Sequence, residues 1–109
     1  MPTHYIEDLT AGMEASYERT VSAADIAAFA AVSGDDNPVH LDEAFAQTTD
    51  FKGRIAHGLL TASFISTVIG TRMPGPGAIY LSQTLRFMAP VRIGDTVKTV
   101  VRVIHLDPR

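Results

Sequence analysis

The segment from His57 to Met73 is the feature that most constrains the fold. Drawn as a helix, it carries leucine, isoleucine, valine and phenylalanine on every face, and such a helix must be buried by surrounding structure. At about 1.5 Å per residue it is roughly 24 Å long, too short for a membrane span but long enough to cross a small domain. The run Met73-Pro74-Gly75-Pro76-Gly77 ends it. We therefore expect a central helix with other structure wrapped around it.

Strand-like segments lie on either side of this helix in the sequence. Residues 15–21 mix Tyr, Thr and Val with charges and predict a short first strand. Residues 78–91 and 96–106 predict two longer strands joined around Gly94-Asp95, most simply as an antiparallel hairpin. A buried helix followed by long strands indicates an α+β fold, in which a curved antiparallel sheet wraps around the helix.

A second helix is expected between the first strand and the central helix. Ser22-Ala23-Ala24-Asp25 has the form of a capping box, and Gly34 is a typical residue at which a helix ends. Residues 41–46 predict a further helical turn or two. The segment between these helices is where the chemistry is concentrated.

Length, charge and composition exclude several classes of function. A chain of 109 residues is expected to form one domain, residues 1–109. Its net charge is −3, and its nine Lys and Arg residues are scattered, so a nucleic-acid partner is not expected. There is no cysteine, which excludes disulfides, thiolate catalysis and cysteine-ligated zinc. No signal-like or membrane-spanning segment is found, so we expect a cytoplasmic protein with no membrane partner.

The segment Ser33-Gly34-Asp35-Asp36-Asn37-Pro38-Val39-His40 brings two carboxylates, an amide and an imidazole into eight residues. Pro38 favours an extended conformation at Asn37, so the chain should turn and let Asp35 and His40 converge. Adding water across a double bond conjugated to a thioester needs a base for the water and an acid for C2, and one carboxylate and one imidazole suffice. The N–H groups of a helix that begins at Gly58 can stabilise the charge on the thioester oxygen.

Two motifs in the sequence resemble those of a known protein family. Ser-Gly-Asp-x-Asn-Pro-x-His at 33–40 and Ile-Ala-His-Gly at 55–58 resemble the motif of the (R)-specific enoyl-CoA hydratases, which belong to the MaoC-like hot-dog family. The similarity extends through Ala78-Ile79-Tyr80-Leu81 to Phe87-x-x-Pro90-Val91-x-x-Gly94-Asp95. The resemblance implies a hot-dog fold and (R)-specific, reversible hydration of trans-2-enoyl-CoA, in fatty acid metabolism or in the supply of polyester precursors.

The resemblance also assigns roles. It implies that Asp35 and His40 hold and activate the catalytic water, with Asn37 supporting them by hydrogen bonding and Ser66 joining that support. The N–H of Gly58 binds the thioester oxygen. It further implies a homodimer, no cofactor, and coenzyme A present only as part of the substrate. From its place at the start of the central helix, His57 is expected to orient or pack rather than to transfer protons.

One departure from the family concerns length. The chain stops at Arg109, after the second strand of the expected hairpin, whereas the family generally continues for about two more strands. We therefore expect a C-terminally shortened MaoC-like domain, with every proposed catalytic position upstream of the missing part.

No metal site is predicted, because the four histidines show no i, i+4 pairing and Asp35 with His40 offers at most two ligands. Lys52, Arg54 and Arg86 are possible contacts for coenzyme A, although solvated surface charge is the more common role for such residues.

Two other functions remain open. A hot-dog thioesterase would direct water at the carbonyl carbon and release free thiol. A non-catalytic subunit that binds acyl thioesters would bind ligand without turnover, and replacing Asp35 would leave its function intact.

Overall fold

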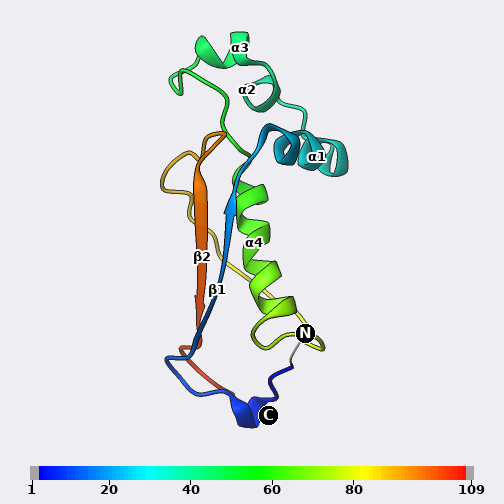
Figure 1. Cartoon of the computed structure of the whole chain (residues 1–109), viewed down its shortest axis with the longest axis vertical. Helices are drawn as coiled ribbons and strands as arrows, with labels where there is room; N and C mark the ends of the chain where they lie inside the picture. Colours follow the sequence, from blue (N-terminus) through cyan, green and yellow to red (C-terminus); the bar gives the residue numbers. More distant parts are fainter. Residues whose placement is uncertain (1–2, 108–109) are drawn as a thin grey trace. The chain divides into compact units, whose positions relative to one another are not determined.

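The computed structural model of the chain describes residues 3–107, so the two ends of the expected domain, residues 1–2 and 108–109, lie outside the described residues. The elements are η1 (Ile6–Asp8), β1 (Glu14–Thr20), α1 (Ala23–Ser33), α2 (Pro38–Leu41), α3 (Glu43–Gln47), α4 (Gly58–Thr71) and β2 (Thr96–Arg102) (Figure 1). The chain divides into two compact units. Unit 1 comprises the residues up to Glu18, Ser63–Thr84 and the residues from Lys98 on, and unit 2 comprises Arg19–Ala62 and Leu85–Val97.

Helix α1 begins and ends where the sequence predicts. The Ser22 hydroxyl accepts a hydrogen bond from the N–H of Asp25, and the Asp25 carboxylate accepts one from the N–H of Ser22, each at 3.1 Å. This is the reciprocal pair of a capping box. At the other end Gly34 takes the left-handed conformation, with φ 80°, and its N–H bonds to the carbonyl of Ala30. The helix is therefore closed at both ends by its own sequence.

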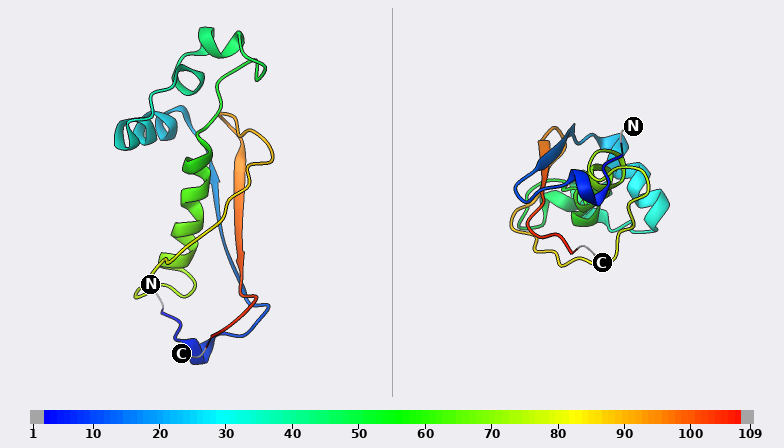
Figure 2. Two further views of the ribbon diagram at one scale, coloured as in Figure 1. Left: turned by 180° about the vertical axis from the view of Figure 1, so that it is seen from behind. Right: turned by 90° about the horizontal axis from the view of Figure 1, so that it is seen from below.

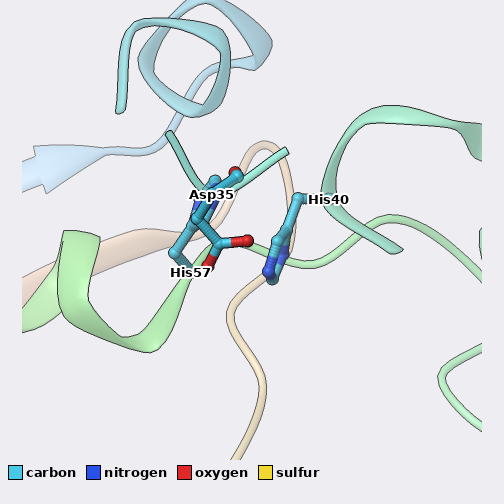
Figure 3. A group of neighbouring side chains, drawn as sticks. All are labelled: Asp35, His40 and His57. Atoms are coloured by element: carbon cyan, nitrogen blue, oxygen red, sulfur yellow. The ribbon is translucent and has the colours of Figure 1, made fainter. Parts of the chain in front are cut away.

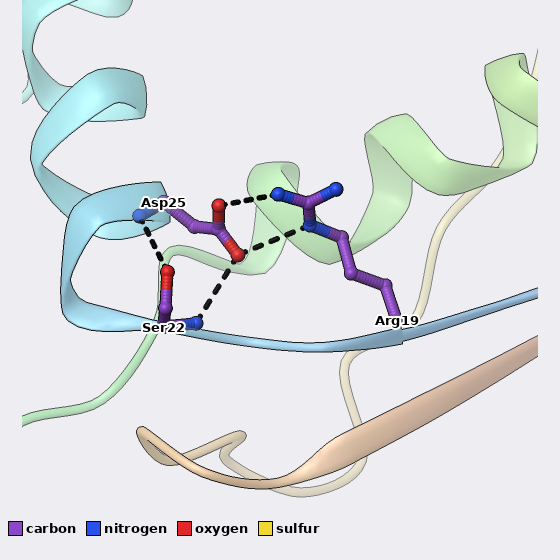
Figure 4. Close-up of polar contacts among 3 residues, drawn as sticks. All are labelled: Arg19, Ser22 and Asp25. Carbon is purple, nitrogen blue, oxygen red and sulfur yellow. Dashed lines mark hydrogen bonds and ion pairs between the residues drawn. The ribbon is translucent and has the colours of Figure 1, made fainter.

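An ion pair reinforces the start of α1 (Figure 4). The Arg19 guanidinium donates through Nε and Nη2 to the two carboxylate oxygens of Asp25, at 3.1 and 2.6 Å. These bonds, followed by the one from the Ser22 N–H, lower the pKa of Asp25 from 3.8 to about 2. Because the folded-state pKa lies below the ordinary value, the interaction stabilises the fold above about pH 4 and is lost as the pH falls through 2.

Replacing Asp25 by Asn is expected to lower the free energy of unfolding by about 1 kcal/mol at neutral pH, since the cap and a solvent-screened ion pair are both weakened. The difference from the unchanged protein should shrink as the pH falls from 5 towards 2. Urea titrations at a series of pH values measure it. A difference that stays constant over this range would show that the charge of Asp25 does not contribute.

Helix α4 confirms the predicted central helix, but its burial differs from the prediction. Its buried apolar side chains are Leu60, Phe64 and Val68, spaced four residues apart on one stripe. Leu59 is 57% exposed, so in this chain the helix is not enclosed on every side. The sequence shows that each face of the helix is apolar but not which part of the chain covers it. Within residues 3–107, no helix has the length and apolar character needed to cross a membrane.

The predicted hairpin is wrong in one of its two strands. The segment 96–106 does contain β2, but β2 pairs with β1 (Figure 1). The pairing is antiparallel: Val103 N–H bonds to the Met13 carbonyl near the start of β1, and Val21 N–H bonds to the Asp95 carbonyl beyond its end. The turn before β2 lies at Gly94, as expected, where φ is 93°.

Residues 78–91 form no strand in the described part of the chain (Figure 2). An extended segment becomes a strand only when a neighbouring backbone completes its hydrogen bonds, and no other described segment pairs with these residues as a strand. Two apolar residues of this segment, Ile79 and Leu81, are 80% and 89% exposed.

Unit 1 is held together by contacts between β1 and α4. The rings of Tyr17 and Phe64 meet edge to face with centroids 5.6 Å apart. The guanidinium of Arg72 lies 5.2 Å from the centre of the Tyr17 ring and donates to the carbonyl of Ser16. These contacts fix the strand to the helix.

Candidate active site

Asp35 is held by two hydrogen bonds to nearby residues in the segment that links α1 to α2. Its N–H donates to the hydroxyl of Ser33 at 3.1 Å, and its carboxylate accepts from the N–H of Asn37 at 3.3 Å. The second contact is the local turn that Asp commonly forms with the residue two positions on. The Asp35 side chain is exposed, so its carboxylate is accessible to a ligand.

His40 is placed by the first turn of α2. The Asn37 side chain caps this helix by accepting from the N–H of Val39 at 3.1 Å, and Pro38 occupies the first helical position, which suits its fixed φ. The helical turns expected from residue 41 therefore begin earlier, because α2 already starts at Pro38.

The imidazole of His40 has a defined orientation. Its Nδ1 lies 2.8 Å from the carbonyl oxygen of Ile55, which can only accept. In the neutral imidazole Nδ1 therefore carries the proton, and Nε2 keeps the lone pair that a general base needs. The N–H of Ile55 in turn bonds to the Val39 carbonyl at 3.3 Å, so the partner of His40 is itself held against α2.

His57 lies between His40 and Phe29, just before α4. Its ring stacks on that of His40 with centroids 3.8 Å apart, and the Phe29 centroid is 4.8 Å away on α1. Its Nε2 lies 2.9 Å from the main-chain carbonyl of Asp35 and donates to it. The residue is 3% exposed, and its Nδ1 has no hydrogen-bond partner among the described residues. His57 thus contacts both of the residues expected to be catalytic.

Asp35, His40 and His57 converge, as Figure 3 shows. Each offers one ligand atom, and these atoms lie within 4.8 Å of one another. The sequence argument against a metal counted two ligands, and it missed the third because His57 is distant in the sequence. One carboxylate and two imidazoles are groups that can bind zinc or another divalent ion. The same spacing also suits a water molecule, since a water with two hydrogen bonds of about 2.8 Å spans about 4.6–4.8 Å.

Gly58, the first residue of α4, is in close contact with Phe87. A Cβ atom built at Gly58 would lie 2.9–3.1 Å from three carbons of the Phe87 ring, closer than side-chain carbons approach one another. A larger residue at this position would therefore require the Phe87 ring to move. The first N–H groups of a helix have no partner within the helix, so the amide of Gly58 is available to an acceptor.

The converging side chains open into a cavity of about 720 Å³ in unit 2. Its lining is Phe29, Ser33, Asp35, His40, Phe51, Ile55, Ala56, His57, Gly58, Leu59, Thr61, Phe87, Met88, Ala89, Pro90 and Val91. Reasoning from the sequence missed the aromatic members. The sequence placed Phe29 within the second expected helix and Phe87 within an expected strand, but it did not bring either ring to this cavity.

Four other residues singled out in the sequence do not line this cavity. Ser66 lies in unit 1 with an exposed side chain, and its expected supporting role stays a prediction. Arg54 donates through Nε to the main-chain carbonyl of His40 at 2.7 Å, so it supports the position of α2. Lys52 and Arg86 are exposed, and their role as contacts for coenzyme A is also still a prediction.

The chain is similar to proteins of known activity. Residues 7–108 match the model of a family described as MaoC like domain. An (R)-specific enoyl-CoA hydratase of Rhodospirillum rubrum is 59% identical over 105 residues, which are 96% of this chain and 73% of that protein. Among solved structures, the (R)-hydratase from A. caviae involved in PHA biosynthesis gives a TM-score of 0.91 at 47% identity, covering 94% of this chain and 77% of that one.

The R-hydratase PhaJ1 from Pseudomonas aeruginosa, in its unliganded form, gives a TM-score of 0.90 at 51% identity, covering 94% of this chain and 66% of that one. The chain therefore spans about two thirds of the length of the Pseudomonas protein and about three quarters of the other two. With helix α4 and the antiparallel strands, these similarities confirm the α+β hot-dog fold predicted from the sequence.

Proposed function

Because this chain belongs to the family of MaoC-like domains, we propose that it hydrates trans-2-enoyl-CoA to (R)-3-hydroxyacyl-CoA in a reversible reaction. The observation that carries the proposal is the convergence of the Asp35 carboxylate and the His40 imidazole on one cavity, where one ligand atom of each lies within 4.8 Å of the other. The names of the relatives support the same reaction, and the (R) configuration at C3 rests on them alone.

The proposed reaction uses a water that bridges this pair. One of the pair, Asp35 or His40, removes a proton from the water as its oxygen bonds to C3, and the electrons of the double bond move towards the thioester oxygen. The pair, which holds the proton taken from the water, then delivers a proton to C2, so that the elements of one water are added. The lone pair on Nε2 suits His40 to accept a proton, and the carboxylate of Asp35 is exposed to the same cavity. The two groups therefore act as a coupled pair on one water.

The negative charge that develops on the thioester oxygen needs a donor. We assign this role to the N–H of Gly58, because it is the first N–H of α4 and lines the same cavity as the pair. Asn37 and His57 support the pair without exchanging protons with the substrate. Asn37 caps the helix that carries His40, and His57 bonds to the main chain of Asp35.

Further parts of the proposal follow the family. The reaction needs no cofactor and no metal, since the two proton-transferring groups and the N–H of Gly58 cover its chemical requirements, and coenzyme A enters as part of the substrate. The chain acts as a homodimer in the cytoplasm, as a single MaoC-like domain. Fatty acid metabolism and the supply of polyester precursors are both consistent with the relatives.

The test is the loss of enone absorbance when purified protein meets a short trans-2-enoyl-CoA, with free thiol monitored in the same sample. We expect enone loss without thiol release, unchanged by a metal chelator. Release of thiol would identify a thioesterase instead. Binding of the thioester with no turnover would favour the non-catalytic subunit, and loss of activity with the chelator would show that the three converging side chains hold a metal.

A further inference from the structure

The ring of Phe87 has a position that the reaction as proposed does not use. It lies against the backbone of Gly58, within 2.9–3.1 Å of where a Cβ would be, and lines the same cavity as Asp35 and His40. It is nevertheless 60% exposed, so much of the ring is free to contact a ligand. An aromatic side chain that is tightly packed at one edge and exposed beside reactive groups is suited to binding an apolar part of a substrate.

The backbone beside Phe87 is fixed to the segment that precedes α4. The N–H of Ala56 bonds to the carbonyl of Val91 at 2.7 Å, and Ile55 pairs with Arg92 in an antiparallel bridge. Ile55 also supplies the carbonyl that orients His40. The same short segment therefore sets the position of His40 and anchors the stretch that carries the Phe87 ring.

We infer that Phe87 determines specificity by packing against the C1–C3 portion of the acyl thioester and excluding substituents at C2. This rests on the proposed function, because it takes the N–H of Gly58 as the donor to the thioester oxygen. If the oxygen lies at that N–H, the atoms next to it lie beside the ring that contacts Gly58. A methyl group at C2 then competes with the ring for space, whereas carbons far along the chain do not meet it.

The test compares Phe87→Ala with the unchanged protein on trans-2-butenoyl-CoA and on its 2-methyl derivative. Removing the ring should lower kcat/KM for the unbranched substrate by about tenfold, because apolar contact is lost. It should also raise the ratio of branched to unbranched kcat/KM by about tenfold or more. Phe87→Leu, which keeps part of the apolar volume, should fall in between and guards against misfolding of the alanine variant. Leu85→Ala is the matched control, since Leu85 is on the same segment but does not line the cavity.

Two results would overturn the inference: a branched-to-unbranched ratio that changes by less than about twofold in Phe87→Ala, or an equal change in Leu85→Ala. A second measurement distinguishes a failure of this inference from a failure of the proposed function. It is the binding of the saturated isomers butyryl-CoA and isobutyryl-CoA, measured by calorimetry. These ligands cannot be hydrated and differ only in the position of one carbon. If the protein binds them but hydrates no enoyl-CoA, the proposed function fails, and the relative affinity for isobutyryl-CoA in Phe87→Ala still decides whether the ring excludes a branch.

Discussion

Replacing Asp35 by Asn is expected to lower kcat for hydration of trans-2-butenoyl-CoA by about 10³-fold, within the range usual for loss of a general acid or base. The amide has the shape of the carboxylate, but it cannot take a proton from water at neutral pH. Initial rates of enone loss, measured at saturating substrate, give the value.

The Asp35→Asn variant should fold normally, which makes it a clean test. Its Oδ1 can still accept from the N–H of Asn37, and the bonds from the Asp35 main chain to Ser33 and His57 do not involve the carboxylate. Thermal unfolding should therefore stay close to that of the unchanged protein. A variant that keeps its fold and more than about a tenth of the activity would remove Asp35 from the chemistry.

Replacing His40 by Asn is expected to reduce kcat by about 10²–10⁴-fold for the same reason. An Asn side-chain amide places its N–H₂ near the position of Nδ1, so it can still donate to the Ile55 carbonyl, while the lone pair at Nε2 is lost. His40→Gln, which places its amide nearer to Nε2, should be equally inactive but less stable. Kinetics and thermal unfolding of the two variants together separate the loss of the base from the loss of the contact.

The double variant tests whether the pair acts on one water. If Asp35 and His40 hold the same molecule, removing both should cost little more than removing one, since the first change already abolishes the activated water. Multiplicative losses would show that each group acts in a separate step.

The local features of the fold were predictable from the sequence because each depends on neighbouring residues. Ser22, Asp25 and Gly34 set the two ends of α1 through contacts within a few positions. The motif at 33–40 likewise works locally, since Asn37 and Pro38 start the turn of helix that presents His40. Residues in such short-range motifs specify their geometry with little help from the rest of the chain.

The predictions that were wrong concern features that depend on residues far away in the sequence. The sequence around Ile79 and Leu81 predicts a strand, but it does not say which backbone pairs with that strand. Likewise β2 pairs with β1 across most of the chain, and no periodicity reveals that choice. The apolar circumference of α4 predicts burial on every side, whereas Leu59 is largely exposed in this chain.

In the candidate site, too, local features were predictable and contacts between distant residues were not. Asp35 and His40 were identified from spacing within one motif, but the stacking of His57 on His40 joins residues 17 positions apart. The contact of Phe87 with Gly58 spans a still longer stretch of sequence. Only the fold brings such groups together, and for this reason the count of possible metal ligands and the aromatic wall of the cavity were both missed.

The most direct test of the central claim is hydration of trans-2-butenoyl-CoA in ¹⁸O-labelled water, followed by mass spectrometry and chiral analysis of the product. The proposed mechanism predicts one ¹⁸O atom in the hydroxyl at C3 of (R)-3-hydroxybutyryl-CoA, with the thioester intact. Label in a released carboxylic acid would contradict it and place the attack at the carbonyl carbon, and a labelled product of (S) configuration would contradict the assigned stereochemistry.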